Sequence, residues 1–164
     1  MAVREQRIVD GSETRSESAT SAGKDKIEFT VYGRPIPKGR PRLGNGRVYT
    51  PDRTKAWEQT IALVYKQKYH SFGFYNGEPL YAEVDAYYGV PKSTAKSVRL
   101  KMLSGEIRPT KRTGDADNVG KLAIDALNGL AYTDDAQIVE IVIRKFYGEP
   151  ERTEIRVGRL NLEK

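Results

Sequence analysis

Two pairs of aspartates are the residues whose type and spacing most readily suggest chemistry. Asp115 and Asp117 form an Asp-x-Asp pair, and Asp134 and Asp135 follow a short distance along the chain. In an extended segment, residues i and i+2 point to the same side, so both carboxylates of the first pair can face one point. Two such carboxylates repel each other unless a cation lies between them. Hard cations such as Mg²⁺ bind one or two carboxylates together with phosphate oxygens and water, so these pairs are candidate metal ligands.

The first pair also has ordinary structural interpretations. Asp117 is predicted to be the N-cap of a helix, where its carboxylate would accept backbone N–H bonds. Lys121 follows one turn later and could form an i,i+4 ion pair with it. Alternatively, Lys121 is a fixed cation that stabilises charge on a phosphate in a transition state. Because Asp-x-Asp also occurs in glycosyltransferases, phosphatases and by chance, spacing alone leaves these interpretations open.

The composition excludes several other kinds of site. The 164-residue chain has no cysteine and a single histidine, His70. Disulfide scaffolds, zinc–thiolate sites, iron–sulfur clusters and cysteine nucleophiles are therefore excluded, as is a metal site with several histidines. A solvated position near the end of a lysine-rich helix is expected for His70. A metal-bound water with a lowered pKa remains as a nucleophile that needs neither cysteine nor histidine.

The net charge of +6 is concentrated in two segments. Gly33–Lys55 and Lys92–Arg112 each contain seven basic residues and one acidic residue. A charged segment is usually a solvated surface, but a loop rich in proline and glycine that carries seven cations repels itself, and a polyanion relieves that repulsion. The sequence therefore predicts nucleic-acid contacts from these basic residues: Arg34, Lys38, Arg40, Arg42, Arg47, Arg53, Lys111 and Arg112.

The elements that must position these residues follow from the hydrophobic pattern. Alternation of apolar and polar residues predicts strands over 27–32, 80–90, 137–147 and 153–159. Helical periodicity predicts helices over 51–70, 94–104 and 117–130, with Thr50 and Ser93 as N-caps of the first two. The proline- and glycine-rich segment 33–49 is predicted to be a loop without regular structure, apart from a turn at 44–46.

These elements favour an α+β domain with one small mixed sheet and helices packed on it. Residues 1–25 are poor in apolar residues and are predicted to be a disordered tail, which leaves 26–164 as a single domain. No apolar run approaches the roughly 18 residues that a membrane span needs, and the N-terminus lacks the apolar core of a signal peptide. We therefore expect a cytoplasmic protein that does not bind membranes.

The segment Gly114–Ile138, GDADNVGKLAIDALNGLAYTDDAQI, resembles the signature of the RusA family of Holliday junction resolvases. That pattern is Asp-x-Asp-Asn, then Lys, then an Asp-Ala-Leu helix segment, then Asp-Asp-Ala-Gln before a strand. The early strand, the stretch PIPKGRPR at Pro35–Arg42 and the helix that follows are also similar to the family. The resemblance covers roughly 27–160, and the tail before it falls outside.

The resemblance implies a homodimer with two active sites on one positively charged face, which cuts two opposed strands of a four-way DNA junction. It also implies that Asp115, Asp117 and Asp135 hold Mg²⁺ or Mn²⁺, with Asp134 as a weaker fourth candidate and Lys121 as an essential lysine. Asn118, in the same motif, joins the basic residues as a candidate DNA contact. Family habit further suggests a bacterial or phage origin.

Three alternatives remain at this point. One is a flap or general branched-DNA nuclease with loose structural preference. Another is a basic DNA-binding module without catalysis, whose aspartates only cap a helix. The third is a nucleotide-sugar transferase that uses Asp-x-Asp, which the small size and the lack of a Rossmann-like βαβ series disfavour.

Overall fold

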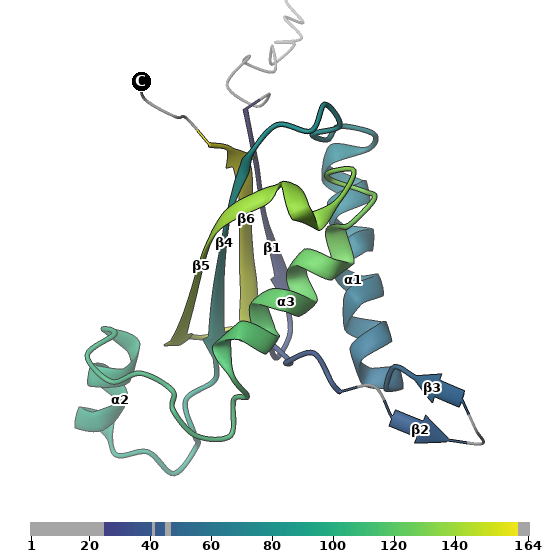
Figure 1. Ribbon diagram of the computed structural model, residues 1–164. Helices are drawn as coiled ribbons and strands as arrows, with labels where there is room; N and C mark the ends of the chain where they lie inside the picture. Colours follow the sequence, from purple (N-terminus) through teal and green to yellow (C-terminus); the bar gives the residue numbers. More distant parts are fainter. Residues whose placement is uncertain (1–24, 41, 45–46, 161–164) are drawn as a thin grey trace, which may run out of the picture.

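The computed structural model describes residues 25–40, 42–44 and 47–160 (Figure 1). The predicted tail, 1–25, lies outside the described residues except for Asp25. The strands are β1 (Lys26–Tyr32), β2 (Arg42–Gly44), β3 (Arg47–Tyr49), β4 (Leu80–Tyr88), β5 (Ile138–Tyr147) and β6 (Arg152–Arg159). The helices are α1 (Asp52–Tyr69), α2 (Lys96–Leu103) and α3 (Ala116–Leu127), and a short 3-10 helix, Asp135–Gln137, precedes β5. None of the described helices is long and apolar enough to cross a membrane.

The main sheet is mixed, with the strand order β1-β6-β4-β5. β4 and β5 are parallel, whereas β6 is antiparallel to both of its neighbours, β1 and β4. Figure 1 shows α1 and α3 on one face of this sheet, with α2 beyond the end of the strands. The α+β class and the mixed sheet with helices packed on it are thus confirmed.

The strand alternation explains which face the helices cover. Every second residue of β1, namely Ile27, Phe29 and Val31, is at most 3% exposed and faces the helices. Alternate residues of β4 and β6 continue this apolar face, so the two-residue period of the strands builds one wall of the core. The helices supply the other wall through side chains that include Ile61, Tyr65, Leu122, Ala123, Ala126 and Leu127.

The opposite face of the sheet carries charge instead of a second layer of helices. Asp85, only 4% exposed, accepts hydrogen bonds from Arg156 at 2.9 Å and from Arg144 at 3.2 Å. Glu83 binds the same two arginines. A buried carboxylate is tolerated when it is paired and hydrogen-bonded, so this network lets the second face remain open.

A bulge in β5 aligns that strand with α3. The register shifts between Leu80 and Tyr81, so that Ile138, Ile141 and Ile143 all lie opposite the inward-facing residues of β4. One extra residue in a strand reverses which side chains face the core. α3 lies directly on this surface, since a Cβ built on Gly120 would be only 2.2 Å from the Ile143 Cδ1.

Several predicted boundaries are corrected by the structure. The 33–49 segment contains the antiparallel hairpin β2–β3, because short strands can pair between the glycines and prolines that limit their length. Pro51, not Thr50, is the N-cap of α1, and Ala95, not Ser93, is the N-cap of α2; neither accepts a side-chain capping bond. α3 begins one residue before Asp117 and ends at Leu127, not at Leu130.

The segment 33–40 crosses the start of α3, where Gly114 meets Pro37. Gly114 has φ +72°, and a Cβ there would lie 2.6 Å from Pro37 Cγ and 2.8 Å from Pro37 Cβ. Both the backbone conformation and the proximity of a rigid proline ring therefore require glycine.

We predict that Gly114→Ala lowers the free energy of unfolding by about 2–5 kcal/mol, because a left-handed backbone penalty of about 1–2 and an overpacking cost of about 1–3 both apply. Gly77→Ala is the matched control, since Gly77 has φ +71° with no atom within 4 Å of the added Cβ. It should cost only about 1–2 kcal/mol. Urea denaturation measures both, and equal losses would contradict the importance of the Pro37 contact.

Candidate active site

The first aspartate pair lies at the start of α3 with exposed carboxylates. Asp115, not Asp117, occupies the N-cap position, and its side chain makes no capping hydrogen bond. Asp117 lies in the first turn of the helix. The predicted structural role of Asp117 as N-cap is therefore wrong. Both carboxylates stand near the positive end of the helix dipole, where negative charge is favoured.

The second pair reaches the same region through the path of the chain. β5 returns along α3, and a groove of about 340 Å³ between them is lined by Asp117, Lys121, Asp125 and Asp135. We call it the carboxylate groove. Apolar side chains complete its lining, namely Ile124 from α3 and Ile138, Ile141 and Ile143 from β5. The structure thus gathers Asp117, Lys121 and Asp135, while Asp115 stands at the helix end outside the residues that line the groove.

Asp134 has a structural role beside Asp135. Its Oδ1 accepts a hydrogen bond from the Ala136 amide at 2.8 Å, and the Asp134 amide donates to Gln137 Oε1 at 3.2 Å, which completes a capping box. The Gln137 side chain also donates to the Phe74 and Glu78 carbonyls. The short helix that carries Asp135 is therefore fixed at its start and along its side.

Asp125 also lines the groove, although it is not among the candidate ligands predicted from the sequence. It forms an ion pair with Lys38, which also lies 3.5 Å from Glu58. Partial burial lowers the pKa of Lys38, but the two carboxylates outweigh this effect and raise the pKa above its usual value. The signal was present in the spacing, because Asp117, Lys121 and Asp125 follow one another at i,i+4.

The donor chemistry of this region fits a hard divalent cation. Carboxylate oxygens are the ligands that Mg²⁺ and Mn²⁺ prefer, and Mg²⁺ commonly uses one or two of them with water and substrate phosphate. Within the described residues, no three acidic or histidine side chains are close enough together to form a complete metal site. The described carboxylates therefore fit a metal site in which substrate phosphate and water supply the remaining ligands.

The loop 111–114, which leads into α3, is held by three side chains from distant parts of the chain. Tyr88 donates its hydroxyl to the Thr113 carbonyl at 2.8 Å, and burial raises the pKa of Tyr88 to about 12. Lys145 of β5 donates to the Gly114 carbonyl at 2.9 Å and to Thr113 Oγ1 at 3.2 Å. Arg34 donates to the Arg112 carbonyl at 3.0 Å. These bonds fix the backbone just before Asp115.

The two basic segments meet at this end of α3. A hollow of about 270 Å³ is lined by Arg34 and Arg53 from the first segment and Arg112 from the second. The Lys38 amide donates to the Asn118 carbonyl at 2.9 Å, which ties the first segment to the helix.

The side chains predicted to contact DNA differ in their exposure and in the bonds that they make within the chain. Arg34 and Lys38 already make bonds within the chain: Arg34 with Glu151 and the Arg112 carbonyl, and Lys38 with Asp125. Arg40, Arg53, Lys111 and Arg112 are exposed and have no ion pair with other described residues. The Asn118 side chain is half-buried. Arg42 and Arg47 lie in β2 and β3, and His70 ends α1 at an exposed position.

Comparison with known proteins points to one family. The family described as "Endodeoxyribonuclease RusA" matches residues 32–158 of the chain. The chain is also similar to the "Uncharacterized protein YqaN" of Bacillus subtilis (strain 168), with 40% identity over 143 residues. That alignment covers 84% of this chain and 99% of the relative.

We predict that Lys145→Met loosens the start of α3 without unfolding the sheet. Loss of the bonds to Thr113 and Gly114 should cost this segment about 1–2 kcal/mol of local stability, or roughly tenfold faster amide hydrogen exchange at 113–119. Lys66→Met, at an exposed position on α1, is the matched control and should change nothing there. Unchanged exchange in Lys145→Met would show that the lysine does not hold the loop.

Proposed function

The chain belongs to the RusA family of endodeoxyribonucleases, and from this membership we propose that it hydrolyses phosphodiester bonds in branched DNA, preferably at four-way junctions. The observation that carries the proposal is the carboxylate groove, where Asp117, Lys121 and Asp135 share one cavity. Convergence of both basic segments on the same end of α3 supports a polyanionic substrate at that place.

Asp117 and Asp135 across the groove are the proposed holders of Mg²⁺ or Mn²⁺, with water and substrate phosphate as the other ligands. Asp115, at the helix end outside the groove, is proposed as a third ligand that joins them when DNA is bound. Such an ion, when bound, lowers the pKa of a water molecule and polarises the phosphate that is attacked. Asp134 is better explained by its capping bonds and is assigned to positioning Asp135.

Lys121 is proposed to stabilise negative charge on the phosphate. Its side chain is exposed on the groove, one turn from Asp117, so its ammonium can face the oxygens of a bound strand. A preformed cation at this point needs no rearrangement as charge develops. The N-terminus of α3 adds further positive potential, because its first amides have no partner within the helix.

The arms of the DNA are proposed to lie along the exposed cations Arg40, Arg53, Lys111 and Arg112. Contacts of this kind go to phosphates, so they supply affinity without reading sequence. For Arg34 and Lys38 we propose a supporting role in place of a direct phosphate contact. Their side chains tie the first basic segment to Glu151, Arg112 and Asp125.

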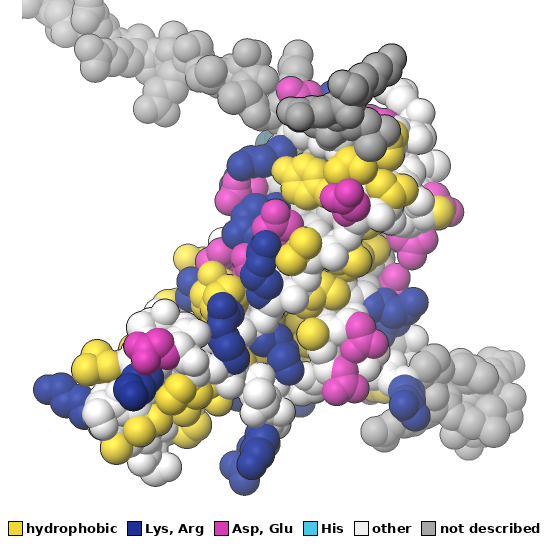
Figure 2. Space-filling view, turned by 60° about the vertical axis from the view of Figure 1, so that its left-hand side comes forward, with side chains coloured by type: hydrophobic (Ala, Val, Ile, Leu, Met, Phe, Trp, Pro, Cys, Tyr) yellow, Lys and Arg dark blue, Asp and Glu magenta, His cyan; other side chains and the backbone are white. Residues whose placement is uncertain are grey.

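A homodimer is proposed because a four-way junction has two strands to cut. β5 is an edge strand of the sheet and exposes Val139, Ile141 and Val142 by 42–57%. Figure 2 shows hydrophobic side chains exposed over this side of the molecule, with Lys and Arg side chains between them. An exposed apolar edge favours pairing with another chain, and pairing along β5 would place two carboxylate grooves at one interface.

Val142→Lys should convert the dimer to a monomer in sedimentation equilibrium, because a lysine on an edge strand opposes strand-to-strand association. Val98→Lys on α2, where Val98 is 37% exposed, is the control and should leave the mass unchanged. A wild-type monomer at all concentrations, or a dimer that survives Val142→Lys, would contradict pairing along β5.

Asp117→Asn should bind a four-way junction at least as tightly as the wild type but lose cleavage by about 100-fold or more, since it removes a ligand and one negative charge. Gel-shift and cleavage assays on the same labelled junction measure the two effects separately. Glu140→Gln, at an exposed position on β5, is a charge-matched control. Full cleavage by Asp117→Asn would overturn the catalytic assignment.

Two of the three rival functions act on DNA and predict different results in the same assays. A flap or branched-DNA nuclease of loose preference would cut flaps and junctions equally at matched salt. A DNA-binding module without catalysis would shift the junction with the same salt dependence but yield no product with any divalent metal.

A further inference from the structure

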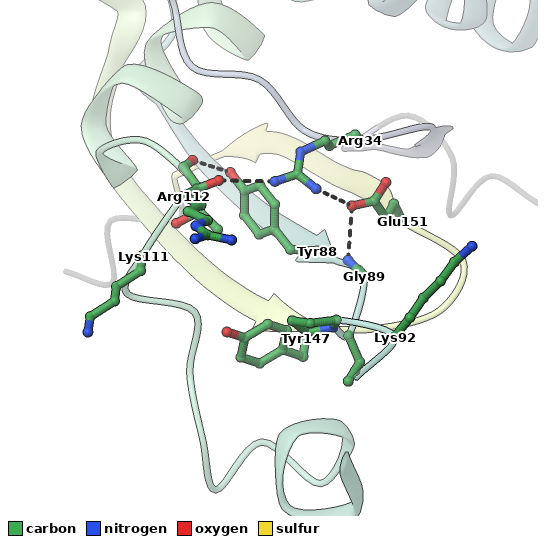
Figure 3. Close-up of a pocket in the computed structure, with 11 residues that line it drawn as sticks. Arg34, Tyr88, Gly89, Lys92, Lys111, Arg112, Tyr147 and Glu151 are labelled. Atoms are coloured by element: carbon green, nitrogen blue, oxygen red, sulfur yellow. Dashed lines mark hydrogen bonds and ion pairs between the residues drawn. The ribbon is translucent and has the colours of Figure 1, made fainter. Parts of the chain in front are cut away.

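A second concave site lies apart from the carboxylate groove, at the ends of β4 and β5 (Figure 3). It has a volume of about 460 Å³ and lies between the segment 89–92 that follows β4 and the loop 111–114. None of its lining residues lines the carboxylate groove. We call it the strand-end cleft.

The polar lining of the cleft is strongly basic. Arg34, Lys92, Lys111 and Arg112 contribute four cations, and Glu151 contributes the only carboxylate of its lining. That carboxylate is already occupied, because Glu151 Oε1 accepts a hydrogen bond from Arg34 at 3.1 Å and from the Gly89 amide at 3.0 Å. Among the described residues, Lys92, Lys111 and Arg112 have no ion-pair partner. The cleft is therefore suited to an anion.

The cleft also has an aromatic and apolar part, which a phosphate alone would not need. Tyr88 and Tyr147 are paired in register at the last positions of their strands. The Tyr88 hydroxyl is committed to the Thr113 carbonyl, and Arg34 lies 5.7 Å from its ring centroid. Tyr147 is half-buried, and no bond joins its side chain to the other residues drawn in Figure 3. Its ring is thus the aromatic surface that a ligand can use.

We propose that the strand-end cleft binds one unpaired nucleotide of branched DNA, with the phosphate on Lys92, Lys111 and Arg112 and the base against Tyr147. The proposal rests on the function proposed above and adds a site, the strand-end cleft, that recognises an unpaired DNA strand. Base-aromatic stacking beside a basic surface is the usual basis of single-strand binding, and it is independent of sequence because every base has a π-face.

The position of the cleft explains how such binding would serve cleavage. Thr113 lines the cleft, and Asp115 follows two residues later. Two residues span at most about 7 Å, so a strand held in the cleft can continue directly across the first aspartate. A base pair cannot enter a cavity of this size without opening, whereas a nucleotide at a branch point is already unstacked at lower cost. The cleft would thereby favour branched over continuous duplex DNA.

The test measures binding of a labelled 12-nucleotide dT strand and of a blunt duplex by fluorescence anisotropy, with the full chain in EDTA. Tyr147→Ala should weaken binding of the dT strand by roughly tenfold and leave duplex binding within about twofold. Tyr147→Phe is the matched control, because it keeps the ring and should bind the dT strand like the wild type. Equal weakening on both probes, or none on either, would overturn the proposal.

A second variant keeps the test valid if Tyr147→Ala does not fold. Lys92→Ala, at an exposed position, should reduce the slope of log K against log salt for the dT strand by about 0.7, the value for one lost phosphate contact on a single strand. Lys96→Ala, an exposed lysine on α2 outside the cleft, should leave the slope unchanged. Identical slopes for both variants would contradict a phosphate site in the cleft.

Failure of this inference and failure of the proposed function are distinguishable. Binding in EDTA does not depend on cleavage. A loss of dT binding in Tyr147→Ala can therefore be measured even if the protein has no nuclease activity. Conversely, metal-dependent junction cleavage together with unchanged dT binding would keep the nuclease and remove the cleft from its mechanism.

Discussion

The backbone of the loop 111–114 is the constraint on which the rest of the site depends. Its carbonyls receive hydrogen bonds from Arg34, Tyr88 and Lys145, which come from the first basic segment, the end of β4 and the body of β5. Gly114 closes the loop at a positive φ against Pro37. Because these partners are far apart in sequence, the start of α3 acquires its position only when the whole sheet has formed.

Each aspartate pair therefore lies at a fixed element: the first pair at the start of α3 and the second directly before β5. Asp117 is placed by α3, whereas Asp135 is placed by a short capped helix that leads into β5. The β5 bulge then turns three isoleucines toward α3, so apolar side chains line the groove beside the carboxylates. Charges near a low-dielectric wall interact more strongly than in open water, which suits a site that handles phosphate.

The sequence predicted the elements better than it predicted their ends. These elements were found because burial enforces a period: two residues in the strands at 27–32 and 137–147, apart from the β5 bulge, and the helical period of the apolar stripe in α3. The caps were missed because Thr50 and Ser93 have suitable side chains, yet the chain starts the helices one or two residues later, where no side-chain cap is made. The ion pairs of Arg34 and Lys38 were not predicted for a different reason: their partners Glu151 and Asp125 are remote in sequence, and no local pattern indicates such a pair.

The most direct test of the central claim is an end-labelled four-way junction incubated with the protein in Mg²⁺, in Mn²⁺ and in EDTA, beside a linear duplex of the same sequence. A nuclease of branched DNA should place paired, symmetric nicks in the junction only with metal and should spare the duplex. A gel shift without any cleavage, or cleavage that persists in EDTA, would contradict the role given to the carboxylate groove.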